Sequence, residues 1–542
     1  MVAPASREER GQSAENPHGQ ITDQLKGEWV GAFQLAKELV YFRVAFKTEQ
    51  QGATVILIRM MQVFPGTTAA VRVESSRISF ELPRDAAPPM AFSGQLVADT
   101  IAGTVQHRAG PGTFQLVRTT DVDPTLYDEY AGSYELEPNR IVFISRRDFD
   151  DPNRPMRYRS ALAYMDESGR QGILSPSSES AFFAGPTYAV SVPVELRITF
   201  LRNDEGRVTG LRWHPNGRPE QFAPRRDLYV GEEVRFQSGD VTLGGRLLVP
   251  STRGPHPAVV LVMGRTGRRA PADRHTASPL AEVLARHGIA ALTYVPGADP
   301  QGDSPLGSLA DDALAAVQYL RHRNDMDPRQ VGLYGISWTA VAAPLAASRS
   351  ADVAFLIIVS GPGLSLGDRY LGLEHPARAR GYSEEETRQE MTFKRLEVEF
   401  SRTGRGWERL KVLEDSVRTM AWFSGTWTVR LNAESRDAPL WRELLRSSLD
   451  DHPVAIMKQV TCPVLAIYGE LDDVVPFDPN GVLIERALRE RRSRDYTIRT
   501  IPRADHGLWD VQPGGPAATT GFAPGYLATL TAWLLERVRV AR

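Results

Sequence analysis

The feature that most constrains the fold is a change in hydrophobic pattern near Leu228. Before it, short runs such as 40–46 (VYFRVAF) alternate in polarity or size and are separated by glycine and proline clusters. After it, continuous apolar runs such as 258–263, 353–359 and 464–468 alternate with segments of helical spacing. Short alternating strands indicate a sandwich or barrel, whereas buried strands between helices indicate a parallel sheet covered on both faces. The sequence therefore predicts a multidomain chain that is all-β first and α/β afterwards.

These patterns give the expected domain boundaries. We expect a flexible polar arm at 1–20, a β-rich domain of barrel or sandwich type at 21–120, and a second small β-rich domain at 121–226. The segment 131–134 (AGSY) echoes 27–31 (GEWVG), a similarity too loose to be called a repeat. Residues 227–542 are expected to form a domain with a mostly parallel sheet and helices on both faces.

One segment, at about 362–456, interrupts the alternation of strands and helices. It is rich in Glu, Arg, Leu and Trp at helical spacing, and Ser383 with Glu386 resembles a capping box. Because unstructured loops of this length are uncommon, we expect a helical cap over the edge of the sheet. Its aromatic residues either line a substrate pocket or form the core of the cap, and both interpretations stay open; they are Trp407, Trp422, Phe423, Trp427 and Trp441.

Composition excludes several classes of function. Lys plus Arg number 64 and Asp plus Glu 66, so the chain has no excess of positive charge for binding nucleic acid. The apolar runs are too short to span a membrane, and the N-terminus shows no apolar segment typical of a secretory signal. We therefore expect a cytoplasmic protein, or a secreted one only if a leader has been removed. Cys462 is the single cysteine, which excludes an intramolecular disulfide and a cysteine-based metal site.

The candidate nucleophile is Ser337, in the segment 333–339 (LYGISWT). It lies between a predicted strand and a predicted helix, the context of the G-x-S-x-G elbow that presents a serine hydroxyl above a sheet. Thr339 occupies the place of the second glycine, which is a departure from that motif. The alternative is that Ser337 merely caps an ordinary helix.

A serine needs a base to accept its proton and an acid to orient that base. The segment 469–476 (GELDDVVP) directly follows a predicted parallel strand, so its carboxylates lie at the same edge of the sheet as Ser337. Asp472 is the preferred acid, Asp473 its rival and Glu470 a more distant third. His506 is the only histidine after Asp472, which makes it the candidate base in the chain order Ser, Asp, His.

Two main-chain amides are expected to stabilise the negative charge of the transition state. One is the N–H of Trp338, which follows the nucleophile at the start of a helix. The other is assigned to Arg265 in the loop 263–267 (MGRTG), where Met263 stands in place of the usual histidine. Met263, Trp422 and Trp427 are candidate substrate-pocket residues. We expect neither a metal ion nor an organic cofactor.

These segments resemble bacterial α/β-hydrolases of the dienelactone-hydrolase and serine esterase or peptidase-like group. The similarity rests on 335–338 (GISW), 469–472 (GELD), 505–507 (DHG) and 309–312 (LADD), and it covers about 228–542. The Asp-x-Arg-Gly turn of such proteins is absent from 297–305. More weakly, 20–226 resembles their β-rich accessory modules, on the basis of Trp29 between glycines and of turns expected at Gly94 and Gly103.

The resemblance implies a serine hydrolase that cleaves an ester, thioester or amide of a small-molecule acyl substrate through an acyl-enzyme. A carboxylic ester is the first choice and a peptide or amide the second. One alternative is an acyltransferase, cyclase or lyase that uses the same triad, because the fold does not determine the reaction. Another is a non-catalytic scaffold with a degenerate hydrolase domain. A homodimer is one arrangement that the β modules allow.

Overall fold

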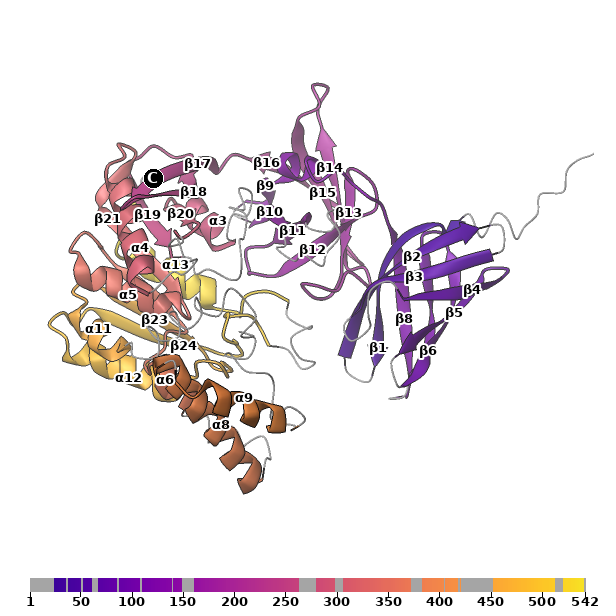
Figure 1. Cartoon of the computed structure of the whole chain (residues 1–542). Coiled ribbons are helices and arrows are strands. Elements are labelled where there is room, and N and C mark those ends of the chain that lie inside the picture. Colours follow the sequence, from indigo (N-terminus) through magenta and orange to yellow (C-terminus); the bar gives the residue numbers. More distant parts are fainter. Residues whose placement is uncertain are drawn as a thin grey trace, which may run out of the picture.

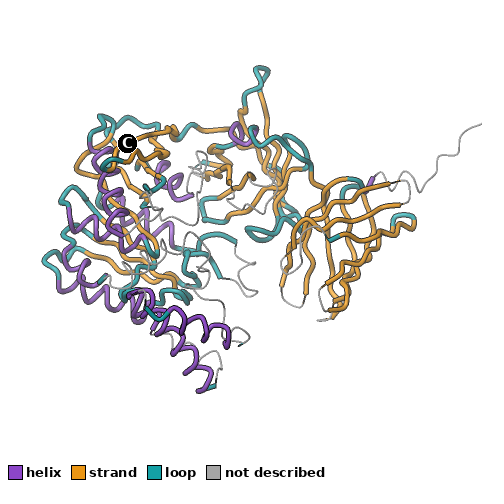
Figure 2. The backbone as a smooth tube through the Cα atoms, viewed as in Figure 1, coloured by secondary structure: helices purple, strands orange, loops and turns teal. Residues whose placement is uncertain are grey.

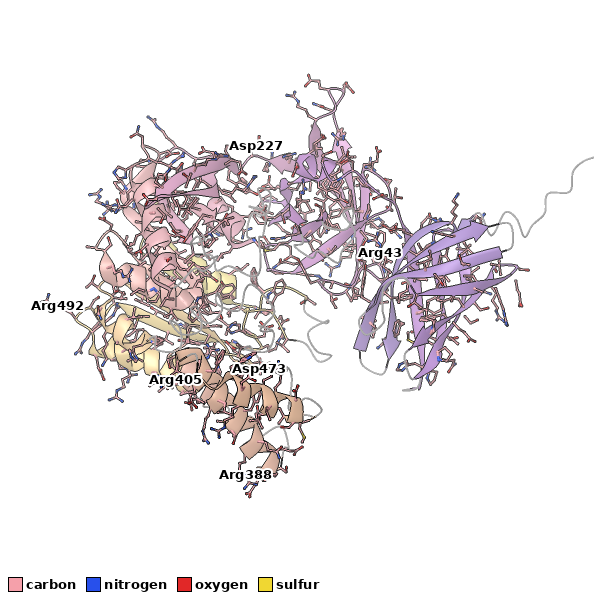
Figure 3. The ribbon with its side chains drawn as sticks, in the orientation of Figure 1. Arg43, Asp227, Arg388, Arg405, Asp473 and Arg492 are labelled. Atoms are coloured by element: carbon pink, nitrogen blue, oxygen red, sulfur yellow. The ribbon has the colours of Figure 1, made fainter. Side chains whose placement is uncertain are left out.

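The computed structural model combines two antiparallel β-barrels with a helix-covered eight-stranded sheet (Figures 1 and 2). Figure 1 shows the second barrel between the first barrel and the sheet, and Asp227 lies on the segment that connects the second barrel to the sheet (Figure 3). The structure describes residues 24–35, 38–49, 52–60, 67–84, 87–107, 110–138, 140–148, 160–262, 279–297, 306–371, 383–403, 405–417, 420, 452–511 and 520–540.

The first barrel is a closed ring in which each strand pairs with the next and β8 returns to β1. Closure leaves no free strand edge. Aromatic side chains fill its interior, among them Trp29 and Phe33, Phe42, Phe80 and Phe92. The strands are β1 (Gly27–Leu35), β2 (Glu38–Glu49), β3 (Gly52–Met60), β4 (Thr68–Glu74), β5 (Arg77–Arg84), β6 (Ala87–Val97), β7 (Thr100–His107) and β8 (Gly110–Thr119).

Gly94 and Gly103, which the sequence places in turns, instead face each other in β6 and β7. A Cβ atom at Gly103 would lie 2.0 Å from the carbonyl oxygen of Ser93. The two glycines therefore permit a close backbone approach within the sheet, a role that glycine patterns in strands also allow.

The second barrel repeats this closed antiparallel plan, with β16 pairing back to β9. A short helix, α2 (Leu126–Tyr130), precedes it. Its strands are β9 (Gly132–Glu137), β10 (Arg140–Asp148), β11 (Ser160–Met165), β12 (Gln171–Pro176), β13 (Ala181–Ala184), β14 (Leu196–Arg202), β15 (Val208–Pro215) and β16 (Gln221–Arg226).

The two barrels share one arrangement of hydrogen bonds, which we call the closing device. An aromatic residue of the first strand and an arginine of the last strand both donate to carbonyl oxygens just before the first strand. Trp29 Nε1 donates to the carbonyl oxygen of Leu25 at 2.9 Å, and the Tyr134 hydroxyl donates to that of Tyr130 at 2.7 Å, four residues back in both cases. An arginine of the last strand then donates to the carbonyl three residues before that aromatic residue: Arg118 to Lys26 at 2.6 Å and Arg225 to Ala131 at 2.8 Å. The faint sequence similarity between 27–31 and 131–134 therefore accompanies a common structural arrangement.

The C-terminal sheet has the strand order β17-β18-β20-β19-β21-β22-β23-β24. Helices α4, α5, α11 and α12 contribute to the core on one face, and α3 and α13 to the core on the other. The strands are β17 (Tyr229–Ser238), β18 (Val241–Pro250), β19 (His256–Leu261), β20 (Ala290–Tyr294), β21 (Met326–Ile336), β22 (Leu356–Val359), β23 (Val464–Gly469) and β24 (Tyr496–Ile501). The helices are α3 (Pro279–Arg286), α4 (Leu306–Arg321), α5 (Thr339–Arg349), α11 (Pro453–Gln459), α12 (Phe477–Glu490) and α13 (Tyr526–Leu535).

These observations correct the predicted fold class. The C-terminal sheet is mixed rather than mostly parallel throughout: β18 pairs antiparallel with both β17 and β20, whereas the pairings from β20 to β24 are parallel. Only two residues join β17 to β18, and such a short connection allows only an antiparallel hairpin. The two small β-rich domains are closed eight-stranded barrels, because the last strand of each pairs with the first.

Within the predicted cap, the structure describes α6 (Leu366–Leu371), α8 (Glu384–Thr403) and α9 (Trp407–Val417). The capping box is present, because the Ser383 hydroxyl accepts from the Glu386 amide at 3.2 Å and Glu386 accepts from the Ser383 amide at 2.8 Å. Trp407 packs on Phe400, with ring centroids 5.1 Å apart, so it belongs to the core of this helix pair. Trp422, Phe423, Trp427 and Trp441 lie outside the described residues. None of the helices in the described ranges has the length and hydropathy needed to cross a bilayer.

Candidate active site

Ser337 occupies a sharp turn between β21, which ends at Ile336, and α5, which begins at Thr339. Its φ of 54° lies in the left-handed region, which is uncommon and strained for a residue with a side chain. The Ser337 amide donates to the carbonyl oxygen of Val359 at 2.9 Å and so ties the turn to β22. Thr339 stabilises the same turn, because its buried hydroxyl accepts from the Ile336 amide at 2.9 Å and donates to the Ile336 carbonyl at 3.0 Å. The threonine that departs from the motif thus stabilises the turn through its hydrogen bonds to the main chain of Ile336.

His506 lies on the loop that follows β24 and contacts both predicted partners. Its Nε2 is 2.8 Å from Ser337 Oγ, and its Nδ1 is 3.0 Å from one oxygen of Asp472 and 3.1 Å from the other. These contacts suit the tautomer in which Nδ1–H donates to the carboxylate and Nε2 accepts the serine proton. The structure therefore brings together three side chains that are far apart in the sequence.

Asp472 contacts the histidine, and neither of its two acidic neighbours does so. Its side chain is fully buried, and Oδ1 accepts the amides of Val474 at 2.9 Å and Val475 at 2.7 Å. Asp473 is exposed at the surface (Figure 3), and Glu470 instead accepts the amide of Arg503 at 2.9 Å. The sequence leaves these three carboxylates as alternatives, and the structure distinguishes them by their positions relative to His506.

Opposing effects act on the pKa of Asp472. Burial alone would raise this pKa, but the hydrogen bonds from His506 and from the Val475 amide stabilise the charged form and hold the pKa below its ordinary value. An ionised carboxylate at this position favours a proton on the facing Nδ1 of His506.

Two further side chains that interact with these residues were not singled out from the sequence. Ser360 is fully buried directly after β22, and its hydroxyl donates to the carbonyl oxygen of His506 at 3.0 Å. Arg369 on α6 interacts electrostatically with Asp472; burial lowers the pKa of this arginine and the aspartate charge opposes that shift. The available sequence signal for Ser360 was its position at the carboxyl end of a parallel strand, where functional residues gather.

The predicted amide donors are only partly described. Trp338 precedes α5, where the first amides of a helix have no intrahelical acceptor and point out from its N-terminus. Met263 and Arg265, like the pocket candidates Trp422 and Trp427, lie outside the described residues. Among the residues that the structure describes, no group of three or more His, Cys, Asp or Glu side chains could hold a metal ion.

Comparison with known proteins gives two curated relatives and no matching family model. The chain is 34% identical over 171 residues to Esterase EstD of Thermotoga maritima, a match covering 29% of this chain and 39% of that protein. It is 32% identical over 157 residues to an uncharacterized protein of Mycobacterium tuberculosis, covering 28% of this chain and 52% of that protein. The matches thus span only about half or less of the relatives' lengths.

Solved structures similar to this chain include a dienelactone hydrolase from Anabaena variabilis, at 19% identity over 58% of this chain and 100% of that chain, with a TM-score of 0.32. Est1E from Butyrivibrio proteoclasticus is 16% identical over 56% of this chain and 96% of that chain, with a TM-score of 0.33. Because these scores are low, the comparison with the curated esterase has the greater weight. It confirms the predicted resemblance to an esterase.

Proposed function

We propose that this chain, which resembles α/β-hydrolase esterases, is a serine hydrolase of carboxylic esters with Ser337 as its nucleophile. One observation carries the proposal: the contact of His506 with Ser337 Oγ at 2.8 Å and with Asp472 at 3.0 Å. A surface serine that merely caps a helix needs neither contact. The similarity to an esterase supports an ester as the substrate.

In the proposed mechanism, His506 Nε2 accepts the hydroxyl proton of Ser337 while Oγ attacks the ester carbonyl. The resulting oxyanion receives a hydrogen bond from the Trp338 amide at the start of α5, where the helix dipole also favours negative charge. Collapse of this intermediate breaks the ester C–O bond, and His506 returns the proton to the leaving alcohol. Water then attacks the acyl-enzyme by the same steps and releases the carboxylic acid.

Asp472 would keep His506 in the required tautomer and stabilise the imidazolium that forms during each step. The amides of Val474 and Val475 fix the orientation of this carboxylate. Ser360 would restrain the main chain of the histidine through its bond to the His506 carbonyl oxygen. No step in this sequence requires a redox change.

The proposal is tested by substituting Ser337→Ala and measuring hydrolysis of p-nitrophenyl esters of increasing acyl chain length. Turnover should fall by about 10⁴-fold or more, because the covalent route is lost. Ser348→Ala is the matched control, since Ser348 lies on α5 and its hydroxyl donates to the nearby carbonyl oxygen of Leu345. A fluorophosphonate should label the unmodified protein and the control but not Ser337→Ala. Undiminished turnover by Ser337→Ala would refute the proposal.

A further inference from the structure

The second barrel is joined by main-chain hydrogen bonds to the α/β domain at the turn between β11 and β12. The amide of Phe522 donates to the carbonyl oxygen of Gly169 at 3.0 Å, and the amide of Gln171 donates to that of Thr520 at 2.7 Å. Arg170 and Gly521 thus form an antiparallel bridge. Residues 520–522 precede α13 and belong to the α/β domain, so this bridge crosses between two domains.

The same segment is bonded on its other side to the loop that carries His506. The Asp510 amide donates to the carbonyl oxygen of Gly521 at 2.9 Å, and the Ala523 amide donates to that of Leu508 at 2.8 Å. Trp509 and Phe522 form a second antiparallel bridge. Three chain segments therefore lie in register: the barrel turn, residues 520–522, and the loop immediately after the histidine.

Aromatic side chains reinforce this connection. Tyr188, in the connection between β13 and β14 of the second barrel, packs edge-on against Trp509 with ring centroids 5.3 Å apart. Trp509 in turn contacts Phe522 at 5.5 Å. The Tyr188 carbonyl oxygen accepts the Ile173 amide at 2.9 Å, which fixes this residue to β12. A residue of the barrel thereby contacts the third residue after His506.

The histidine loop needs such support because its backbone is strained. Arg503 and Leu508 have φ angles of 58° and 60°, in the left-handed region that side-chain-bearing residues seldom adopt. Each such residue costs about 1–3 kcal/mol and persists only where its surroundings hold it. Within the loop, Asp505 Oδ1 accepts the amides of Gly507 and Trp509, both at 2.9 Å. These local bonds shape the loop, whereas the bonds to 520–522 connect it to the barrel.

We propose that the second barrel is part of the catalytic unit: its 166–170 turn and Tyr188 position the loop that holds His506 against Ser337. Tyr188 and the turn act as positioning residues through that loop. The inference rests on the proposed function for its catalytic consequence. Its structural consequence, restraint of residues 503–511 by the barrel, holds independently of the reaction.

Gly521 offers a way to break the connection. Its φ is 153°, and a Cβ atom there would lie 2.0 Å from the carbonyl oxygen of Gly169, so Gly521→Ala forces the barrel turn away. Gly217→Ala is the matched control in the second barrel, since Gly217 also has a positive φ, of 70°, but no described residue other than its chain neighbours lies within 4 Å of its Cβ position. Tyr188→Ala removes the aromatic contact, and Tyr188→Phe retains the ring.

We expect Gly521→Ala to lower kcat by about 10²-fold with little change in KM, because a displacement of a catalytic group by about 1 Å has an effect of this size. Tyr188→Ala should lower kcat by about tenfold, and Tyr188→Phe should restore it. Both disruptive variants should accelerate amide hydrogen exchange in residues 503–511. Gly217→Ala should match the unmodified protein in kcat and in exchange of this loop, although its own turn is strained.

Unchanged exchange of residues 503–511 and unchanged kcat in both Gly521→Ala and Tyr188→Ala would overturn the inference. If Gly521→Ala does not fold, the Tyr188→Ala and Tyr188→Phe pair decides. Failure of the proposed function gives a different result: Ser337→Ala would keep its turnover, or a fluorophosphonate would not label the unmodified protein. In that case, hydrogen exchange still tests the restraint of the loop by the barrel.

Discussion

The two barrels close in the same way but face different neighbours. The first packs through Val30, Ala32 and Val117 against Phe183 and Val190 of the second. The second also contributes Ile141, Phe143 and Met165 to the core that contains α3 and α13 of the α/β domain. The inward-facing residues thus define a barrel in both cases, whereas the outward-facing residues decide whether the barrel packs on the other barrel alone or also on the α/β domain.

The junction of the second barrel with the α/β domain is polar as well as apolar. The Arg286 guanidinium of α3 lies over the Phe143 ring of β10 at 5.5 Å from its centroid. Arg147 of β10 acts electrostatically on the buried Glu282 of α3, whose carboxylate also accepts from the Tyr229 hydroxyl at the start of β17 at 3.4 Å. Because a titratable group is buried in this apolar contact, the stability of the second barrel should depend on pH, and that of the first barrel should not.

Removing the hydrogen-bonded aromatic residue of the first strand in each barrel should give the largest difference in activity between the two barrels. Trp29→Ala and Tyr134→Ala each remove a fully buried side chain and its hydrogen bond, at an expected cost of about 3–5 kcal/mol in stability. Thermal unfolding should show both losses. Ester hydrolysis near 25 °C should be retained by Trp29→Ala and reduced by Tyr134→Ala, because among the described residues the loop of His506 is contacted by the second barrel and not by the first. Equal losses of activity would show that the two barrels are not functionally distinct.

An effect of pH should come from Glu282. Burial raises the pKa of this carboxyl to about 7, while Arg147 of β10 and the Tyr229 hydroxyl partly oppose the shift. Its pKa in the unfolded chain is near 4.5, so the folded protein binds the additional proton, and stability falls as pH rises from about 4.5 to about 7.

Glu282→Gln, which stays neutral, should therefore remove up to about 3 kcal/mol of this pH dependence and make the protein relatively more stable at pH 8. Denaturant unfolding at pH 5 and pH 8 measures the change. Glu137→Gln, at an exposed residue of the second barrel, is the control and should leave the profile unaltered. A wild-type profile in Glu282→Gln would contradict the expectation.

The smallest effect is expected at the arginines that close the two barrels. Arg118→Ala and Arg225→Ala each remove charge-assisted bonds to main-chain carbonyls, at about 1–2 kcal/mol in the free energy of unfolding. Arg118 also pairs with the exposed Asp99 at 2.8 Å, but Asp99→Asn should cost less than about 0.5 kcal/mol. Similar losses at the two arginines would support a shared closing device, and a negligible loss at either would argue against it.

The sequence predicted the change of architecture near Leu228 because the period of hydrophobic residues is a local property that can be read directly from the sequence. It did not distinguish a sandwich from a closed barrel, since that depends on whether β8 reaches β1 and β16 reaches β9. Nor did it predict the two antiparallel pairings of β18, which arise from strand order at the edge of the sheet.

For the candidate site, the order of Ser337, Asp472 and His506 and their positions after strands were sufficient to nominate the three residues. The sequence preferred Asp472 but kept Asp473 as its rival, and in the tertiary structure Asp472 is buried beside the imidazole whereas Asp473 is exposed. The contacts of Ser360 and of the second barrel with the histidine loop were likewise decided by the fold. Most of these contacts join residues far apart in the chain through at least one main-chain atom, and main-chain hydrogen bonds leave little trace in the side chains that a sequence records.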